Sequence, residues 1–276
     1  MLGYFDTLSV SKPLIIGIVN VTPDSFSDGG EALNSQAAIK RGLLLHEEGA
    51  DIIDVGGEST RPGALPITIE EEIRRVIPVI EQLANYGLKV SVDTRHSEVM
   101  SRAVESGAEI INDVSALTND PRSLELIAKL GVAVILMHMR GSPLTMQQQP
   151  QYKNAPLEIR NYLTKRIETC VLAGIKKTNI AVDPGLGFGK SLRHNLQILN
   201  KLELLVDLGY PIVLGASRKS FIGLINKEED PKCRLAGSLA VAILSMTKGV
   251  NLFRVHDVLA TRQALDVARA IGDAKI

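Results

Sequence analysis

The sequence contains no tryptophan, only two cysteines and no excess of charge of either sign. Cys170 and Cys233 follow no metal-binding spacing and are too few for a disulfide framework, which suits a reducing compartment. Because 31 basic residues balance 31 acidic ones, no net field would attract nucleic acid or an anionic membrane. Small polar molecules are therefore the expected partners.

The sequence also lacks a long apolar run and a secretory start. The longest mostly apolar stretch, residues 235–246, is well short of the roughly 20 residues that a bilayer span requires. Residues 1–6 do not combine a basic region with an apolar one, as a signal peptide does. We therefore expect a cytoplasmic protein with no membrane contact.

Two nucleotide-binding motifs begin in the sequence but are incomplete. Residues 189–191 read Gly-Lys-Ser, like the end of a P-loop, but Pro184 stands where the first glycine of that motif belongs. Gly185 and Gly187 begin a dinucleotide fingerprint, and Lys190 replaces its third glycine. Neither a triphosphate site nor a dinucleotide site is predicted.

Short apolar runs alternate with helical patterns along the whole chain, with no break in composition. Eight runs are read as strands, at 14–19, 50–55, 90–92, 110–111, 132–137, 180–182, 211–214 and 252–253. This alternation is typical of parallel βα units, and eight units close a barrel. We predict a single (β/α)₈ TIM barrel domain over residues 1–276. A doubly wound open sheet is the alternative, but it would usually show the missing dinucleotide turn.

Two helical segments add detail to this prediction. Thr68 and Glu71 are spaced as a capping box before apolar residues at helical intervals. Residues 234–248 are more apolar than one buried face requires, which indicates either a homodimer contact or burial in the core.

Polar residues stand at the ends of the predicted strands or just after them. In a (β/α)₈ barrel these ends share one face, where binding sites are built. Asp183 opens the run Asp-Pro-Gly-Leu-Gly-Phe-Gly-Lys, whose glycines let the backbone approach a ligand closely. The residues expected to converge are Asn20, Asp93, Asn112, Asp183, Lys219 and Arg254.

Asp93, Asn112 and Asp183 together indicate a site for a planar heterocycle. A carboxylate can accept two parallel N–H groups from a guanidine-like ring edge. The amide of Asn112 supplies a donor and an acceptor for neighbouring ring atoms. Each residue alone could instead cap a helix.

Basic residues at the last strands indicate an anion site. Arg254 and His256 lie two apart on a strand, so their side chains share a face. The region after strands seven and eight is a common phosphate site in barrels, and Lys219 with a serine of the 217–220 segment would complete it. A surface ion pair between Arg254 and Asp257 is the alternative.

Metal ligands are sparse in this sequence. Asn20 could offer its amide oxygen to Mg²⁺, an ion that takes most of its ligands from phosphate and water. The five histidines show no close pair, so a zinc site is not expected.

Taken together, the polar segments resemble the signature blocks of the dihydropteroate synthase family. The matching segments are 20–30, 56–63, 112–114, 137–139, 183–190, 217–223 and 254–257. The resemblance implies a transferase that joins 7,8-dihydropterin-6-ylmethyl diphosphate to 4-aminobenzoate, giving 7,8-dihydropteroate and diphosphate in folate biosynthesis. It also implies Mg²⁺ as cofactor, a homodimer, and sulfonamides as mimics of the aminobenzoate.

The same resemblance implies roles for individual residues. The pterin pocket falls on Asp93, Asn112, Asp183 and Lys219, and the diphosphate and Mg²⁺ contacts fall on Asn20, Arg254 and His256. The 4-aminobenzoate site falls on Thr60, Arg61, Pro62, Phe188, Lys219 and Ser220. The expected catalytic residues are Asp93, Asp183, Lys219 and Arg254.

The expected mechanism is SN1-like, because a pterin ring can delocalise the cation left when diphosphate departs. Asp93 and Asp183 would stabilise that cation. Two rival functions stay open: a pterin-dependent methyltransferase on the same barrel, which has no use for a diphosphate pocket, and a non-catalytic pterin-binding paralogue. Arg95 and His96 are not expected to take part.

Overall fold

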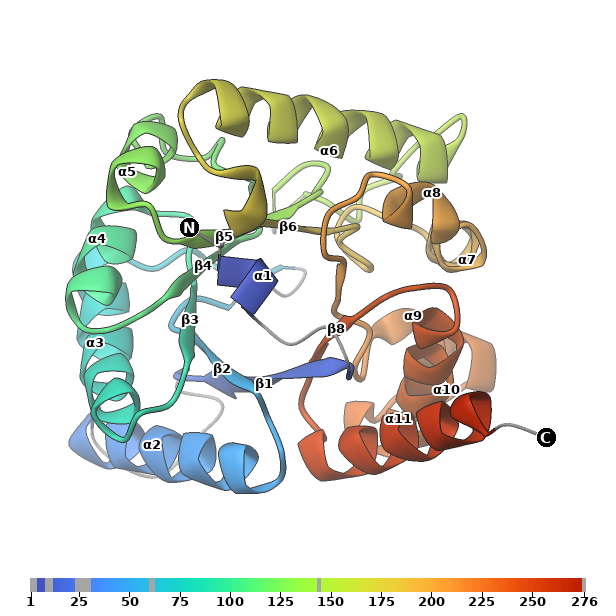
Figure 1. Ribbon diagram of the computed structural model, residues 1–276, viewed down its shortest axis with the longest axis horizontal. Coiled ribbons are helices and arrows are strands. Elements are labelled where there is room, and N and C mark those ends of the chain that lie inside the picture. Colours follow the sequence, from blue (N-terminus) through green and yellow to red (C-terminus); the bar gives the residue numbers. More distant parts are fainter. Residues whose placement is uncertain (1–3, 8–11, 23–30, 60–62, 143–144, 275–276) are drawn as a thin grey trace.

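Eight parallel strands form the centre of the molecule (Figure 1). The computed structural model describes residues 4–7, 12–22, 31–59, 63–142 and 145–274. The strands are β1 (Leu14–Asn20), β2 (Ile52–Gly56), β3 (Val90–Asp93), β4 (Ile110–Asp113), β5 (Ala133–Met137), β6 (Ile180–Asp183), β7 (Val213–Leu214) and β8 (Leu252–Val255).

The sheet closes on itself. Neighbouring strands follow the order β6-β5-β4-β3-β2-β1-β8-β7, so β6 and β7 form its two ends. A parallel bridge between Val182 and Ile212 joins these ends, and the Val182 N–H donates to the Pro211 carbonyl at 2.9 Å. The predicted (β/α)₈ barrel is confirmed.

Helices surround this barrel in a ring (Figure 1). The outer helices are α2 (Glu31–Glu47), α3 (Ile69–Asn85), α4 (Ser97–Glu105), α5 (Ser123–Leu130), α6 (Ala155–Leu172), α7 (Leu192–Asn200), α8 (Glu203–Val206), α9 (Ser220–Asn226), α10 (Leu235–Met246) and α11 (Val258–Asp273). Two short 3₁₀ helices are η2 (Lys177–Asn179) and η3 (Pro231–Arg234). The remaining helix, α1 (Tyr4–Thr7), lies over the centre of the ring in Figure 1.

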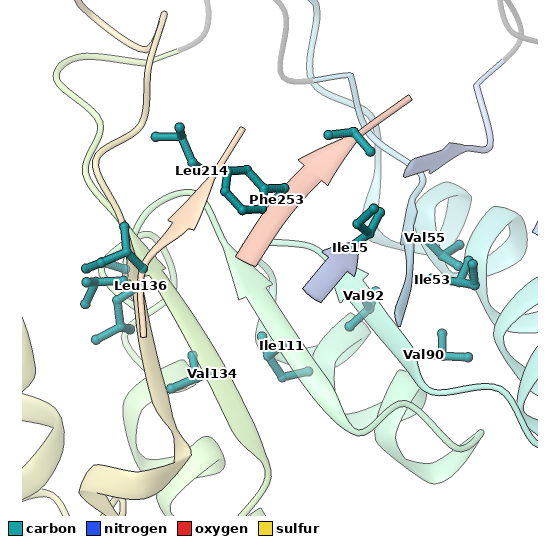
Figure 2. Packing of buried hydrophobic residues seen from close by; sticks show 14 of the residues in the cluster. Ile15, Ile53, Val55, Val90, Val92, Ile111, Val134, Leu136, Leu214 and Phe253 are labelled. Carbon is teal, nitrogen blue, oxygen red and sulfur yellow. The ribbon is translucent and has the colours of Figure 1, made fainter. Parts of the chain in front are cut away.

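Alternating residues along each strand serve two separate cores, because successive side chains point to opposite faces. One set, which includes Ile53, Val92 and Phe253, packs between the strands and the helices (Figure 2). The other set fills the barrel interior with Ile16, Ile52, Ile110, Ala133, Ile135, Ala181, Val213 and Leu252. Phe5 of α1 belongs to this second core.

The predicted capping box at the start of α3 is only half formed. The Thr68 hydroxyl accepts from the Glu71 N–H, as expected. The Glu71 carboxylate, however, pairs with Arg74 and Arg75, which follow it by one helical turn. An arginine one turn away therefore competes successfully for the carboxylate that the box requires.

Candidate functional site

Strand register brings the polar residues to one rim of the barrel. Asn20 is paired with Gly56, Gly56 with Asp93, and Asp93 with Asn112. A Cβ placed on Gly56 would lie 3.4 Å from the Cβ of Asp93 and 3.9 Å from Oδ1 of Asn20. The absence of a side chain at Gly56 thus leaves space between these two polar groups.

Asp183 reaches the same space from the far side of the barrel. A Cβ placed on Gly215 would lie 3.9 Å from Oδ2 of Asp183 and 4.0 Å from the Cβ of Arg254. The acid of β6 and the base of β8 therefore meet beside Gly215, although 71 positions separate them in the sequence numbering (254 − 183). This is the convergence that the barrel prediction required.

An ion network occupies the floor of this space. Arg254 donates from Nε to Oδ2 of Asp54 at 2.6 Å and from Nη2 to Oδ2 of Asp93 at 2.7 Å. Asn112 donates from Nδ2 to the same oxygen of Asp54 at 3.2 Å. The alternative interpretation, a surface ion pair of Arg254 with Asp257, is wrong, because Asp257 is held by Arg218.

Asp54 was not among the residues expected in the site. It is fully buried within β2, and its Oδ1 has no hydrogen-bond partner in the described part of the chain. The signal was a single carboxylate inside the apolar run Ile-Ile-Asp-Val at 52–55. A charge in such a run requires a partner, and here that partner lies 200 positions away.

Charge and burial act against each other in this network. Burial raises the pKa of Asp93 to about 7; the nearby Arg254 opposes the rise, and the charges of Asp54 and Glu72 add to it. Burial lowers the pKa of Arg254, but the carboxylates of Asp54 and Asp93 outweigh it and raise that pKa. Asp93 can therefore change its protonation state near neutral pH, whereas Arg254 stays charged.

Asp183 and Lys219 lie close enough for their charges to interact. Oδ1 of Asp183 accepts from the Gly185 N–H at 2.6 Å. Burial raises the pKa of Asp183, while that N–H and the charges of Lys219 and Arg254 oppose the rise. Burial and the charge of Arg254 lower the pKa of Lys219 to about 8. Burial therefore opposes the charged form of both groups.

The predicted aminobenzoate residues are only partly described. Lys219 lies with its Nζ 4.1 Å from the centre of the Phe188 ring, and Ser220, the first residue of α9, is exposed beside it. Thr60, Arg61 and Pro62 lie outside the described residues. The role of all six residues in 4-aminobenzoate binding remains a prediction.

His256 is placed with Ser217 rather than with Arg254. Nδ1 of His256 lies 3.0 Å from the Ser217 hydroxyl, which also accepts from the His256 N–H at 3.2 Å. Burial, followed by repulsion from Arg254 and Arg218, lowers the pKa of His256 to about 3. The ring is therefore neutral at physiological pH and can contribute hydrogen bonds but no charge.

Two residues that the sequence left without a role hold the start of the β2–α3 loop. Arg95 donates to both carboxylate oxygens of Glu58 at 3.0 Å, and His96 contacts the fully buried Glu72 at 2.7 Å. The Glu72 hydrogen bond raises the pKa of His96. These pairs tie the β3–α4 loop to the chain on either side of residues 60–62.

Within the residues that the structure describes, no cluster of three acidic, histidine or cysteine side chains could hold a metal ion. Asn20 is then left as the one predicted protein ligand. Among the same residues, no helix is long and apolar enough to cross a membrane.

The sequence and the fold match a known class of enzyme. The profile of the family described as "pterin binding enzyme" matches residues 16–256, so the site belongs to a pterin-binding barrel. The chain is 46% identical to dihydropteroate synthase of Escherichia coli K12 over 271 residues, which are 98% of this chain and 95% of that protein. The chain belongs to the dihydropteroate synthase family.

Solved structures agree with this assignment. The structure of Xanthomonas albilineans dihydropteroate synthase with 4-aminobenzoic acid has a TM-score of 0.91 at 48% identity, covering 96% of this chain and 95% of the other. The structure of the same enzyme with 7,8-dihydropteroate has a TM-score of 0.88 at 46% identity, covering 97% of this chain and 96% of the other. The structure of the Yersinia pestis enzyme with a sulfonamide drug has a TM-score of 0.91 at 42% identity, covering 96% of each chain.

Proposed function

We propose that the protein joins 7,8-dihydropterin-6-ylmethyl diphosphate to 4-aminobenzoate, releasing diphosphate and 7,8-dihydropteroate. The observation that carries the proposal is the convergence of Asp93, Asn112 and Asp183 with Arg254 and Lys219 at one end of the barrel. Relatives of the same family and fold support it.

The acids and the amide suit the pterin. Asp183 is held by the Gly185 N–H through one oxygen, so its other oxygen can accept from the ring edge. Asn112 donates to Asp54, which leaves its amide oxygen available as an acceptor. Asp93, with a pKa of about 7, can bind a ring nitrogen either as acceptor or as donor.

Arg254, His256 and Asn20 would hold the diphosphate. The guanidinium has five donors and uses two of them on Asp54 and Asp93, so others are free for an anion. Asn20 fits Mg²⁺ as an amide ligand turned toward the mouth, with the diphosphate supplying further oxygens. When bound, the ion would neutralise charge on the leaving diphosphate.

The reaction would proceed by cleavage before attack. The C–O bond to the diphosphate breaks, and its electron pair leaves with that group. The pterin-stabilised cation then lies near Asp93 and Asp183, whose negative charge favours it. The neutral arylamine supplies the electron pair for the new C–N bond and afterwards loses one proton. No strong base is required by this order of events.

Phe188 and Lys219 would form the described half of the aminobenzoate site. The ring of Phe188 provides an apolar wall for the aromatic amine, and Lys219 and Ser220 provide partners for its carboxylate. The proposed residues Thr60, Arg61 and Pro62 would complete the site from the β2–α3 loop.

Incubation of the purified protein with dihydropterin diphosphate, 4-aminobenzoate and Mg²⁺ tests the proposal. We expect equimolar release of diphosphate and 7,8-dihydropteroate, with a sulfonamide competing against 4-aminobenzoate. Binding of a pterin without diphosphate release would instead support the non-catalytic paralogue. Methyl transfer to or from a pterin would support the methyltransferase.

A further inference from the structure

Lys190 is a buried cationic side chain to which the proposed function assigns no role. It is 3% exposed, and its Nζ lies 2.9 Å from the Phe188 carbonyl, 3.2 Å from the His138 carbonyl and 3.0 Å from Nδ1 of His138. Three acceptors match the three N–H bonds of an ammonium group. All three belong to two residues of neighbouring loops, so one side chain joins the β5–α6 loop to the β6–α7 loop.

His138 is suited to accept from this lysine. Burial, followed by the charge of Lys190, lowers the pKa of His138 to about 2, so its ring is neutral. The ring is 4% exposed and packs edge-to-face on Tyr162, with 4.9 Å between ring centres. Burial also lowers the pKa of Lys190, and the nearby charge of Asp183 opposes this. The contact between Lys190 and His138 is therefore buried, and Lys190 lies close enough to Asp183 for their charges to interact.

The β6–α7 loop, which contains Lys190, packs closely against the β5–α6 loop. Gly185 and Gly189 have φ values of 66° and 64°, and a Cβ on either would overlap a backbone oxygen, that of His138 or Arg140. Tyr152 donates its hydroxyl to the Gly189 carbonyl at 3.0 Å. The two loops thus lie backbone against backbone.

Phe188 connects Lys190 to the proposed 4-aminobenzoate site. The carbonyl of Phe188 accepts from Lys190, and its ring lies 4.1 Å from Nζ of Lys219. A shift of the Phe188 backbone would move the ring away from Lys219 and displace the apolar wall proposed for the aromatic amine. A methionine at 190 would fill the same space without the desolvation that a buried amine suffers, so packing alone does not explain the lysine.

We propose that Lys190 is a positioning residue of the 4-aminobenzoate site, acting through the Phe188 backbone to fix the Phe188 ring against Lys219. This inference rests on the proposed function. It assigns to Lys190 the geometry of one substrate's site and not the binding of the pterin.

Steady-state kinetics of Lys190→Met test this role. The substitution keeps an unbranched side chain, one atom shorter than lysine, and removes all three donors. We expect the KM for 4-aminobenzoate to rise about tenfold, the ratio that corresponds to one lost charge-assisted hydrogen bond, while the KM for the pterin diphosphate changes less than about twofold. Lys190→Gln, which keeps an N–H₂ donor, should restore part of the difference. Lys177→Met, on the exposed 3₁₀ helix η2, is the matched control.

A fluorescence measurement tests the same inference without turnover. The chain has no tryptophan, so Phe188→Trp introduces a single reporter. We expect Phe188→Trp/Lys190→Met to show lower anisotropy and stronger acrylamide quenching than Phe188→Trp alone.

The measurements distinguish a wrong role for Lys190 from a wrong proposed function. Unchanged 4-aminobenzoate KM in Lys190→Met, or an unchanged reporter, overturns the role of Lys190. An equal rise in both KM values, or a fall in melting temperature with both KM values intact, overturns it as well, because it would show general destabilisation. Absence of turnover in the wild type would count against the proposed function, and the reporter then decides on Lys190.

Discussion

Arg254 neutralises the two carboxylates at the floor of the site. Its guanidinium lies between the carboxylates of Asp54 and Asp93, and Asp54 is fully buried. Removing the arginine would leave two negative charges close together with little water to solvate them. The same side chain therefore supports the fold and the proposed diphosphate site.

Replacement of Arg254 by alanine should lower both turnover and stability. Loss of the cation beside the leaving group predicts a fall in kcat/KM of about 100-fold or more. The carboxylates left unpaired predict a loss of about 3 kcal/mol in the free energy of unfolding. In Arg254→Ala/Asp54→Asn, part of the stability should return while turnover does not. Steady-state kinetics and urea unfolding measure the two effects, and wild-type kinetics in Arg254→Ala would remove it from the site.

Asp93 predicts a pH dependence of stability. Burial raises its pKa from 3.8 to about 7, so between these values the folded state holds a proton that the unfolded chain releases. The contribution of this group to the free energy of unfolding is then full below the lower value and decreases as pH rises toward the upper one. We expect the difference in unfolding free energy between wild type and Asp93→Asn to change across that window and to be level outside it. A difference independent of pH would contradict the raised pKa.

Helix α9 shows how an element can end in a strained residue. Lys227 follows the helix with φ 56°, in the left-handed region, and its N–H reaches the Gly223 carbonyl. The side chain is exposed, so the conformation is imposed by the helix end and not by packing of the lysine. Glycine adopts this conformation without the clash that a Cβ introduces.

Lys227→Gly should therefore raise stability by about 0.5 kcal/mol. The gain is the relief of left-handed strain, about 1 kcal/mol or more, minus the extra freedom of glycine in the unfolded chain. Lys201→Gly is the control, because Lys201 also ends a helix, α7, but at φ −118°. Thermal unfolding should separate the two variants in opposite directions, and equal losses would show that the conformation at 227 carries no strain.

Prediction of elements from the sequence was accurate where a local pattern decides the structure. Each apolar run became a strand, and β1, β3 and β6 end on the expected polar residues Asn20, Asp93 and Asp183. The predicted capping box is only half formed because Arg75, one turn after Glu71, competes for its carboxylate. The role of the buried Asp54 was missed because its partner, Arg254, lies in the last strand. Long-range pairing of charges leaves no periodic signal in one sequence.

In the described part of the molecule, half of the exposed large apolar side chains lie on the last three helices. They are Leu224 and Ile225 of α9, Leu244 of α10, and Leu259, Val267 and Ile271 of α11. Helices α10 and α11 also pack against each other. We propose that these side chains lie in the interface of the expected homodimer, because large exposed apolar patches are typical of subunit interfaces.

Light scattering after gel filtration should give a mass of twice 29.8 kDa. Leu244→Glu should shift that mass to the monomer, because a carboxylate cannot be buried without a partner. Leu172→Glu, at the exposed end of α6, should leave the mass unchanged. A monomeric wild type, or a dimer that tolerates Leu244→Glu, would count against this interface.

The order of strands around the barrel has a further consequence. Read from one end of the sheet to the other, the chain runs β7, β8, β1 and onward to β6, and the bridge between Val182 and Ile212 joins the two ends. A circularly permuted gene that begins just before β7 and links residue 276 back to residue 1 would encode the strands in their spatial sequence. The segment through α7 and α8 would no longer connect β6 to β7 and would form the C-terminal end of the permuted chain, while the remaining ladder would stay covalently in register.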